Sequence, residues 1–306
     1  MPYNELAKDY NPKYRIGFYA MPDNLKTKIE NALNSDFFEI SDDLNEVDLI
    51  LTGEKRQNLG VSNVMTIKVS EDPTDLDAMS LNDEEFNETI EILVNEAIYA
   101  NALRMKIMEE KNREAIIEDY LTLLRKKDPY TYEHAVNVAK YSVLIAKQMG
   151  KTEDEVNSIW MGGLLHDIGK ICLPDSILFN QTKILSDEKK KVMQLHPVLG
   201  AIMLPDELKK LQSMVLYHHE RFDGKGYPYG LFGNEIPEES LIIAVADCYD
   251  AMTTNRSYQK AMSHEKAMSI LYELAMPSSD NKGIALPLDK VSALNSALNK
   301  ENNKTL

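Results

Sequence analysis

Five of the six histidines in this 306-residue chain lie between residues 134 and 219. They are His134, His166, His196, His218 and His219. A protein core has little use for so many imidazoles, because each ring brings two polar nitrogens that must find partners. Imidazole nitrogens are good ligands for divalent transition metals, so the cluster predicts a metal centre.

Two aspartates extend this set of candidate ligands. Asp167 directly follows His166, so an imidazole and a carboxylate lie within one turn of the chain. A carboxylate can bind one ion with each oxygen, which would let Asp167 bridge two metals. Asp247 lies in the apolar helical segment LIIAVADCYDAMTT, where an unpaired carboxylate would be costly. Asp250 follows three residues later and can share its helix face.

The size of the ligand set separates a catalytic site from a structural one. A structural zinc site needs four ligands and commonly includes cysteine, whereas seven nitrogen and oxygen ligands exceed the needs of one ion. We therefore expect two divalent ions, and iron, manganese, zinc and nickel all suit such ligands. Two adjacent ions can activate water and stabilise charge on a phosphoryl group, which is the chemistry of phosphoester hydrolysis.

Two cationic residues are placed to act on a phosphate beside the metals. Lys170 follows His166 by four residues, and a cation there would favour developing negative charge. Arg256 follows the Asp247 segment and offers planar donors that suit a phosphate or a base. The alternative for both is a solvated side chain at a helix end. His264, outside the cluster, is expected to be an ordinary surface or core histidine.

Helical segments with short breaks must position these residues. The hydrophobic period from Asp128 onward predicts an all-α domain, and Ser263 is expected to cap its last helix. Asp223–Pro237 is rich in glycine and proline and predicts a loop. The predicted helices span residues 130–149, 153–167, 187–194, 196–204, 207–219, 239–255 and 263–275.

Residues 1–80 have a different pattern, which predicts a small α/β domain for signal input or docking. Strands are expected at 14–20, 37–40, 47–53 and 64–69, and a helix at 25–33. The order is similar to a receiver domain of two-component signalling. However, Ala20 follows the first strand where a receiver has acidic residues, and Thr52 stands where its phosphorylated aspartate would be. An unrelated input domain is the alternative.

Residues 81–127 are expected to form a long connecting helix. From Asn82 onward this segment lacks proline and glycine, and its apolar residues from Phe86 to Ala100 alternate at four- and three-residue steps. Such a seam is typical of a short coiled coil and predicts a homodimer, with packing against the helix's own domain as the alternative. The fold class is therefore α+β overall: an α/β domain (1–80), a linker helix (81–127) and an all-α domain (128–306).

The composition excludes some partners and favours one compartment. A net charge of −15 should repel nucleic acid polymers and anionic membranes. No apolar signal segment or membrane span is visible in the sequence. Cys172 and Cys248 show no pairing pattern, so we expect core cysteines in a reduced, cytoplasmic protein.

The order of these segments is similar to that of a known family. From about Asp128 to Ala275 the chain resembles the HD-GYP family of bacterial cyclic-di-GMP phosphodiesterases, a branch of the HD superfamily. Gly226, Tyr227 and Pro228 match the signature loop of that family. The matching segments are residues 128–134, 164–171, 174–178, 193–196, 218–228, 244–247 and 256–261.

The resemblance implies roles for particular residues. Asp167 would bridge two metals, one held also by His134, His166 and Asp247, and the other by His196, His218 and His219. Lys170 would act on the scissile phosphate, with Tyr227, Arg256 and Gln259 at the substrate. The substrate would be cyclic-di-GMP, opened to pGpG and onward to GMP. The signature loop, or the N-terminal domain, would dock a signalling partner.

Several positions depart from the family pattern. Tyr130 stands where some members carry a glutamate for a third metal, so we expect two metals here. Gln259 replaces a basic residue, which weakens one phosphate contact. The altered rim raises a second hypothesis, in which the site binds cyclic-di-GMP with little turnover and passes the signal to a partner. A phosphohydrolase acting on another nucleotide is a third.

Overall fold

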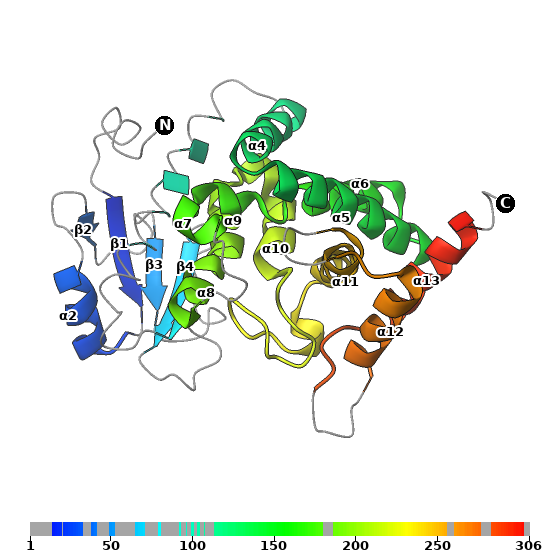
Figure 1. Ribbon diagram of the computed structural model, residues 1–306. Coiled ribbons are helices and arrows are strands. Elements are labelled where there is room, and N and C mark those ends of the chain that lie inside the picture. The colour runs from blue at the N-terminus through cyan, green and yellow to red at the C-terminus, as the bar shows by residue number, and fades with distance from the viewer. Residues whose placement is uncertain are drawn as a thin grey trace. The chain divides into compact units, whose positions relative to one another are not determined.

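The computed structural model divides into two compact units, which are described separately (Figure 1). Unit 1 comprises Met1–Lys106 and Cys172–Leu195, and unit 2 comprises Ile107–Ile171 and His196–Leu306. The residues that the structure describes are 14–19, 21–32, 38–41, 49–52, 65–70, 79–80, seven positions between 92 and 107, 113–179, 186–255, 260–276 and 283–302.

Unit 1 contains a five-stranded sheet in which every described strand pair is parallel, in the order β2-β1-β3-β4-β5. Ile16 and Leu51 are buried on its strands, as are Leu25 and Ile29 on the adjoining helix. The elements are β1 (Tyr14–Tyr19), α2 (Asp23–Ala32), β2 (Phe38–Ile40), β3 (Leu49–Thr52), β4 (Met65–Ser70), β5 (Met79–Ser80), α7 (Asp175–Leu178) and α8 (Asp187–Met193).

The first four strands lie in the segments where strands were predicted, and α2 overlaps the predicted helix. The short strand β5 was not predicted. That these elements form an independent input or docking domain over residues 1–80 stays a prediction. The seven described positions between 92 and 107 are all helical, and the single linker helix over 81–127 also stays a prediction.

In the described part of unit 2 the regular elements are all helices, and one isolated bridge joins Asp223 and Phe232. Its helices are α4 (Arg113–Lys127), α5 (Pro129–Gln148), α6 (Glu153–Leu165), α9 (His196–Met203), α10 (Lys209–Tyr217), α11 (Glu238–Thr253), α12 (His264–Leu274) and α13 (Leu288–Asn302). Short 3-10 turns occur at η2 (Ile168–Cys172), η3 (Asp206–Leu208) and η4 (Gly233–Glu235).

The seven predicted helices are confirmed, each within two residues at either end. Ser263 caps α12 as expected, because its hydroxyl accepts a hydrogen bond from the Lys266 amide. No helix was predicted after residue 275, yet α13 is present. Its buried face consists partly of small side chains, such as Ala293 and Ala297, so its apolar stripe is weak in the sequence.

Helix α5 is the centre of unit 2 and packs against α4, α6, α11 and α13 (Figure 1). Its start is fixed by the Asp128 side chain, which accepts from the Tyr130 amide, and by Pro129 at the first helical position. Helix α6 approaches closely at Gly163, where a Cβ atom would lie 2.7 Å from the Cα of Ala139. This contact fixes the relative positions of the two helices that carry His134 and His166.

Among the described helices, none combines the length and the apolar character that a membrane span requires.

Candidate metal centre

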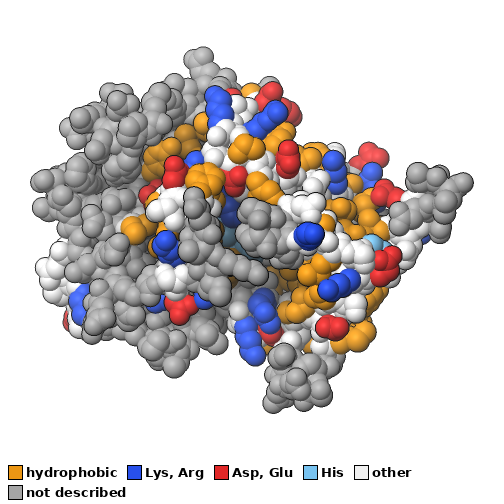
Figure 2. Space-filling model, viewed as in Figure 1, with side chains coloured by type: hydrophobic (Ala, Val, Ile, Leu, Met, Phe, Trp, Pro, Cys, Tyr) orange, Lys and Arg blue, Asp and Glu red, His pale blue; other side chains and the backbone are white. Residues whose placement is uncertain are grey.

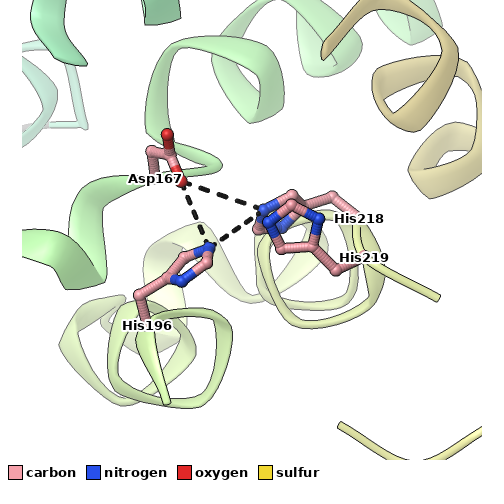
Figure 3. A group of neighbouring side chains, drawn as sticks. All are labelled: Asp167, His196, His218 and His219. Carbon is pink, nitrogen blue, oxygen red and sulfur yellow. Dashed lines mark hydrogen bonds and ion pairs between the residues drawn. The ribbon is translucent and has the colours of Figure 1, made fainter. Parts of the chain in front are cut away.

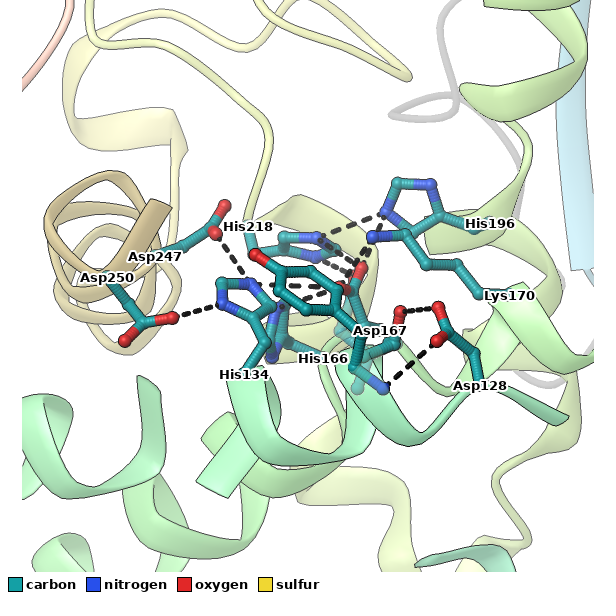
Figure 4. Close-up of polar contacts among 12 residues, drawn as sticks. Asp128, His134, His166, Asp167, Lys170, His196, His218, Asp247 and Asp250 are labelled. Atoms are coloured by element: carbon teal, nitrogen blue, oxygen red, sulfur yellow. Dashed lines mark hydrogen bonds and ion pairs between the residues drawn. The ribbon is translucent and has the colours of Figure 1, made fainter. Parts of the chain in front are cut away.

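The ends of three helices and the inner faces of two others converge on one buried cluster (Figure 4). His134 projects from α5, His166 ends α6, His196 begins α9, His218 and His219 follow α10, and Asp247 and Asp250 lie on α11. Asp167 sits between α6 and η2. In the space-filling view, histidine atoms are visible in a hollow near the middle of the face (Figure 2).

Gly169 allows the η2 turn to reach α9. A Cβ atom there would lie 2.0 Å from the carbonyl oxygen of His196 and 2.4 Å from the amide nitrogen of Gly200. Only glycine permits such a close approach of two backbones. Asp167, two residues earlier, is thereby held beside His196.

Asp167, His196, His218 and His219 form what we call the second ligand group, whose ligand atoms all lie within 4.8 Å of one another (Figure 3). Oδ1 of Asp167 is 3.2 Å from Nε2 of His196 and 4.0 Å from Nε2 of His218. These spacings are near the span of about 4 Å across a coordination sphere with metal–nitrogen bonds of about 2.0–2.1 Å. The second ligand group matches the ligand set that the family resemblance implied.

His134, His166 and Asp167 form the first ligand group, again within 4.8 Å of one another. Oδ2 of Asp167 is 3.4 Å from Nε2 of His166 and 3.9 Å from Nε2 of His134. Asp247, predicted as a fourth ligand, lies beside this group, with Oδ1 3.0 Å from Nε2 of His134. Asp167 belongs to both groups, with a different oxygen facing each (Figure 4).

The hydrogen bonds of the rings show that the site fits a cation. Nδ1 of His166 lies 2.8 Å from the Gly163 carbonyl, and Nδ1 of His218 lies 2.7 Å from the Val215 carbonyl. A carbonyl only accepts, so each Nδ1 carries a hydrogen, and Nε2 is the nitrogen of each ring that is left to face the cluster and bind a cation. Within the described part of the chain, the buried Nε2 of His166 and Oδ1 of Asp167 have no hydrogen-bond partner. Acceptor atoms that converge in this way repel one another unless a cation lies between them. The two groups therefore have the arrangement needed to hold metal ions.

His134 of the first group and the adjacent His218 and His219 of the second group have opposite electrostatic environments. Burial acts to lower the pKa of His134, but hydrogen bonds to Asp247 and Asp250 outweigh it and raise the pKa to about 9. Burial and the neighbouring His196 lower the pKa of His219 to about 3. Burial and the neighbouring His219 likewise hold the pKa of His218 well below its usual value.

Lys170 points at the shared aspartate (Figure 4). Its Nζ donates to Oδ2 of Asp167 at 2.7 Å, and its side chain is 21% exposed. Burial would raise the pKa of Asp167, but the charge of Lys170 and contacts with His166 and His196 hold it well below the usual range. The carboxylate is therefore ionised and ready to bind cations.

The signature loop packs against the second ligand group. The ring of Tyr227 lies 4.7 Å from that of His219, and its amide donates to the His219 carbonyl. Gly226 is required here, because a Cβ atom would lie 2.3 Å from the Arg221 amide nitrogen. The buried carboxylate of Glu220 accepts from the amides of Tyr229 at 2.7 Å and of residue 231 at 3.0 Å.

Some predicted site residues lie outside the part of the chain that the structure describes, and some residues of the site were not predicted. Arg256 and Gln259, predicted at the substrate, are outside the described residues. Glu220 was not predicted, although it directly precedes the glycine-rich loop, whose backbone amides need hydrogen-bond acceptors. Asp250 was expected only to share a face with Asp247, and the structure instead places it behind His134. His264 contacts the Tyr249 hydroxyl at 3.0 Å, which agrees with its expected ordinary role.

With this geometry established, the chain was compared with known proteins. The family model of the HD domain matches residues 119–281, which is more than half of the chain. The chain belongs to the HD domain family. Among HD proteins it is of the HD-GYP type, as its relatives and its signature loop confirm.

Three relatives illustrate the similarity. The chain is 37% identical over 172 residues to the cyclic di-GMP phosphodiesterase response regulator RpfG of Xanthomonas campestris, covering 55% of this chain and 45% of that protein. It is 38% identical over 157 residues to the cyclic di-GMP phosphodiesterase PA4108 of Pseudomonas aeruginosa, covering 50% and 37%. It is 34% identical over 196 residues to 3'3'-cGAMP-specific phosphodiesterase 3 of Vibrio cholerae, covering 63% and 40%. The chain spans less than half the length of these relatives.

Proposed function

We propose that this HD-GYP chain is a metal-dependent phosphodiesterase that hydrolyses cyclic-di-GMP to pGpG and onward to GMP. The observation that carries the proposal is the pair of ligand groups joined by Asp167, with the ammonium of Lys170 on the same carboxylate. Two named relatives with more than a third of their aligned residues identical are cyclic di-GMP phosphodiesterases, which supports this substrate.

Two divalent ions would be held by the seven residues around the cluster, with iron or manganese favoured over zinc or nickel. The first ligand group, completed by Asp247, would hold one ion, and the second ligand group the other. When bound, the ions supply Lewis-acid polarisation of a phosphate and activation of water. The residues of the chain fix where that chemistry takes place, because every ring that faces the cluster is buried or half-buried.

Lys170 and Tyr227 would bind the substrate phosphate and its surroundings. The ammonium of Lys170 has three donors, and one bond to Asp167 leaves donors for a phosphate oxygen. Burial and the charge of Asp167 raise the pKa of Tyr227 well above its usual value, so its hydroxyl keeps its proton and can donate to a substrate oxygen. Arg256 would clamp a phosphate or base, and Gln259 would make a weaker contact in place of a cation.

The remaining parts of the chain would connect this chemistry to signalling. The signature loop or the N-terminal α/β domain would contact a signalling protein, and the linker helix would form a homodimer. The two cysteines are both free, which supports a reducing cytoplasmic setting.

A product assay tests the proposed activity. The full chain, loaded with Mn²⁺ or Fe²⁺, is incubated with cyclic-di-GMP, and pGpG and GMP are resolved by anion-exchange chromatography. An Asp167→Asn variant, of nearly the same shape, is the control. Product formation that does not exceed this control would refute hydrolysis of cyclic-di-GMP.

A second candidate is a binding module with little turnover, and the observation that favours it is Gln259 at a position where the family has a cation. Calorimetry with cyclic-di-GMP and, separately, 3'3'-cGAMP distinguishes the candidates. Tight binding without product in the assay above would support the module. Faster turnover of 3'3'-cGAMP than of cyclic-di-GMP in that assay would make 3'3'-cGAMP the preferred substrate. An absence of binding to either dinucleotide would exclude the module.

A further inference from the structure

Asp250 is a fully buried carboxylate for which the proposed hydrolysis gives no direct role. Its relative exposure is 0%, and it lies on α11 one turn after Asp247. Oδ2 lies 2.6 Å from Nδ1 of His134, and Oδ1 accepts from the Thr254 hydroxyl at 2.8 Å. Each oxygen therefore has a fixed partner, and the carboxylate cannot rotate without breaking a hydrogen bond.

The contact determines which nitrogen of His134 is available to a metal ion. Because a carboxylate only accepts, Nδ1 of His134 carries a hydrogen and donates it to Asp250. Nε2 is then directed at Asp167 and Asp247, at 3.9 and 3.0 Å (Figure 4). A negatively charged acceptor on Nδ1 also makes the opposite nitrogen a stronger electron donor to a metal.

The other oriented histidines have weaker partners. His166 and His218 donate through Nδ1 to the backbone carbonyls of Gly163 and Val215, which are neutral. Of these three rings, His134 is the one whose partner is a charged side chain. A substitution at Asp250 should therefore act on one ligand group and leave the other unchanged.

We propose that Asp250 is a positioning residue that holds His134 in its metal-binding orientation and thereby sets the affinity of the first ligand group selectively. Thr254 supports it by holding the second carboxylate oxygen. The inference rests on the metal centre of the proposed function but not on the identity of the substrate. It therefore survives if cyclic-di-GMP proves not to be hydrolysed.

The test is a titration of the metal-free full chain with Mn²⁺, in which the electron paramagnetic resonance signal of free Mn²⁺ reports binding. Asp250→Asn keeps the shape of the side chain but removes its charge. We expect it to weaken one ion by about 10- to 100-fold, as is typical for an outer partner of a ligating histidine, and to leave the other unchanged. Thr254→Val should weaken the same ion by a smaller factor.

Two further variants identify the affected ion. His134→Gln should weaken the same ion, and Asp250→Asn added to His134→Gln should have no further effect, because Asp250 acts through that ring. Glu239→Gln removes another acid from α11, near its start, and serves as the matched control, for which wild-type affinities are expected.

Three outcomes would overturn the proposal. They are unchanged Mn²⁺ affinities in Asp250→Asn, equal weakening of both ions, and an undiminished effect of Asp250→Asn in the His134→Gln background. Thermal unfolding of the metal-free variants identifies any that fail to fold. If Asp250→Asn is among them, the Thr254→Val titration decides, since this variant keeps the carboxylate.

Discussion

The two ligand groups share Asp167 but differ in how one histidine of each, His134 and His219, is held. In the first ligand group, His134 lies between the carboxylates of Asp250 and Asp247. In the second ligand group, His218 is held by a backbone carbonyl and His219 packs against the ring of Tyr227. His166 of the first group is held by the Gly163 carbonyl, as His218 is by that of Val215, so the difference lies in His134, which is fixed by charge, and in His219, which is supported by aromatic packing.

This difference has a consequence for metal binding. A histidine between carboxylates retains a proton, and the pKa of His134 is raised to about 9 after its hydrogen bonds outweigh burial. A histidine among other buried imidazoles loses its proton, and burial with His196 lowers the pKa of His219 to about 3. Metal must compete with a proton at His134 but not at His218 or His219, although all three ligands are of the same type.

The largest effect is expected where the groups meet. Asp167→Asn removes the one carboxylate whose two oxygens face both groups, so both ions should bind more weakly by more than the roughly 10- to 100-fold typical of outer partners. Metal content of the purified variant, measured by mass spectrometry, checks this. Retention of either ion at the wild-type level would show that Asp167 does not join the two groups.

The next largest effect should separate catalysis from metal binding. Lys170→Met removes the cation that we propose binds the reacting phosphate, and turnover should fall by roughly 100- to 1,000-fold while metal content is retained. Lys170→Arg keeps the charge and should recover part of the rate. Steady-state rates and metal analysis on the same samples test this, and loss of metal in Lys170→Met would assign the residue a structural role instead.

The pH dependence of binding should differ between the groups. Below pH 9 the metal-free His134 carries a proton that must leave when an ion binds, so affinity of the first group should fall about tenfold per unit as pH decreases. His218 and His219 are already deprotonated at neutral pH and should release none. Calorimetric titration with Mn²⁺ in buffers of different ionisation enthalpy measures the number of protons released when the ions bind. The same proton release in His134→Gln would contradict this assignment.

The smallest effect concerns the aromatic support of the second group. Tyr227→Leu removes the ring against His219, an aromatic contact worth about 0.5–1.5 kcal/mol, so the second ion should weaken by roughly two- to tenfold. Tyr227→Phe keeps the ring and should bind Mn²⁺ as wild type does. Tyr229→Leu is the control, because Tyr229 lies in the same loop but its ring contacts Tyr217. An equal loss of Mn²⁺ affinity in this variant would show that the loop as a whole, and not the Tyr227 ring, supports the second group.

Much of the helical unit could be predicted because helices leave a local signature. Apolar periodicity located α5, α6 and α11, and the clustering of histidines along the chain located the candidate metal ligands. The weak stripe of α13 escaped, since its small residues carry little periodic contrast. In the site, Asp247 was named as a ligand through the family resemblance, whereas the helix period only placed Asp250 on the same face. The contact of Asp250 with the far side of the His134 ring depends on how α5 and α11 pack.

The sequence by itself determined the types of the candidate ligand residues and the helices that carry them. Residue chemistry and local periodicity are encoded within a few positions of the chain. Only the tertiary structure decided which oxygen of Asp167 faces which ring, and that Asp250, 116 positions from His134, holds its Nδ1. Such contacts depend on helix packing, as at Gly163 and Gly169, where backbones meet at distances that no local pattern specifies.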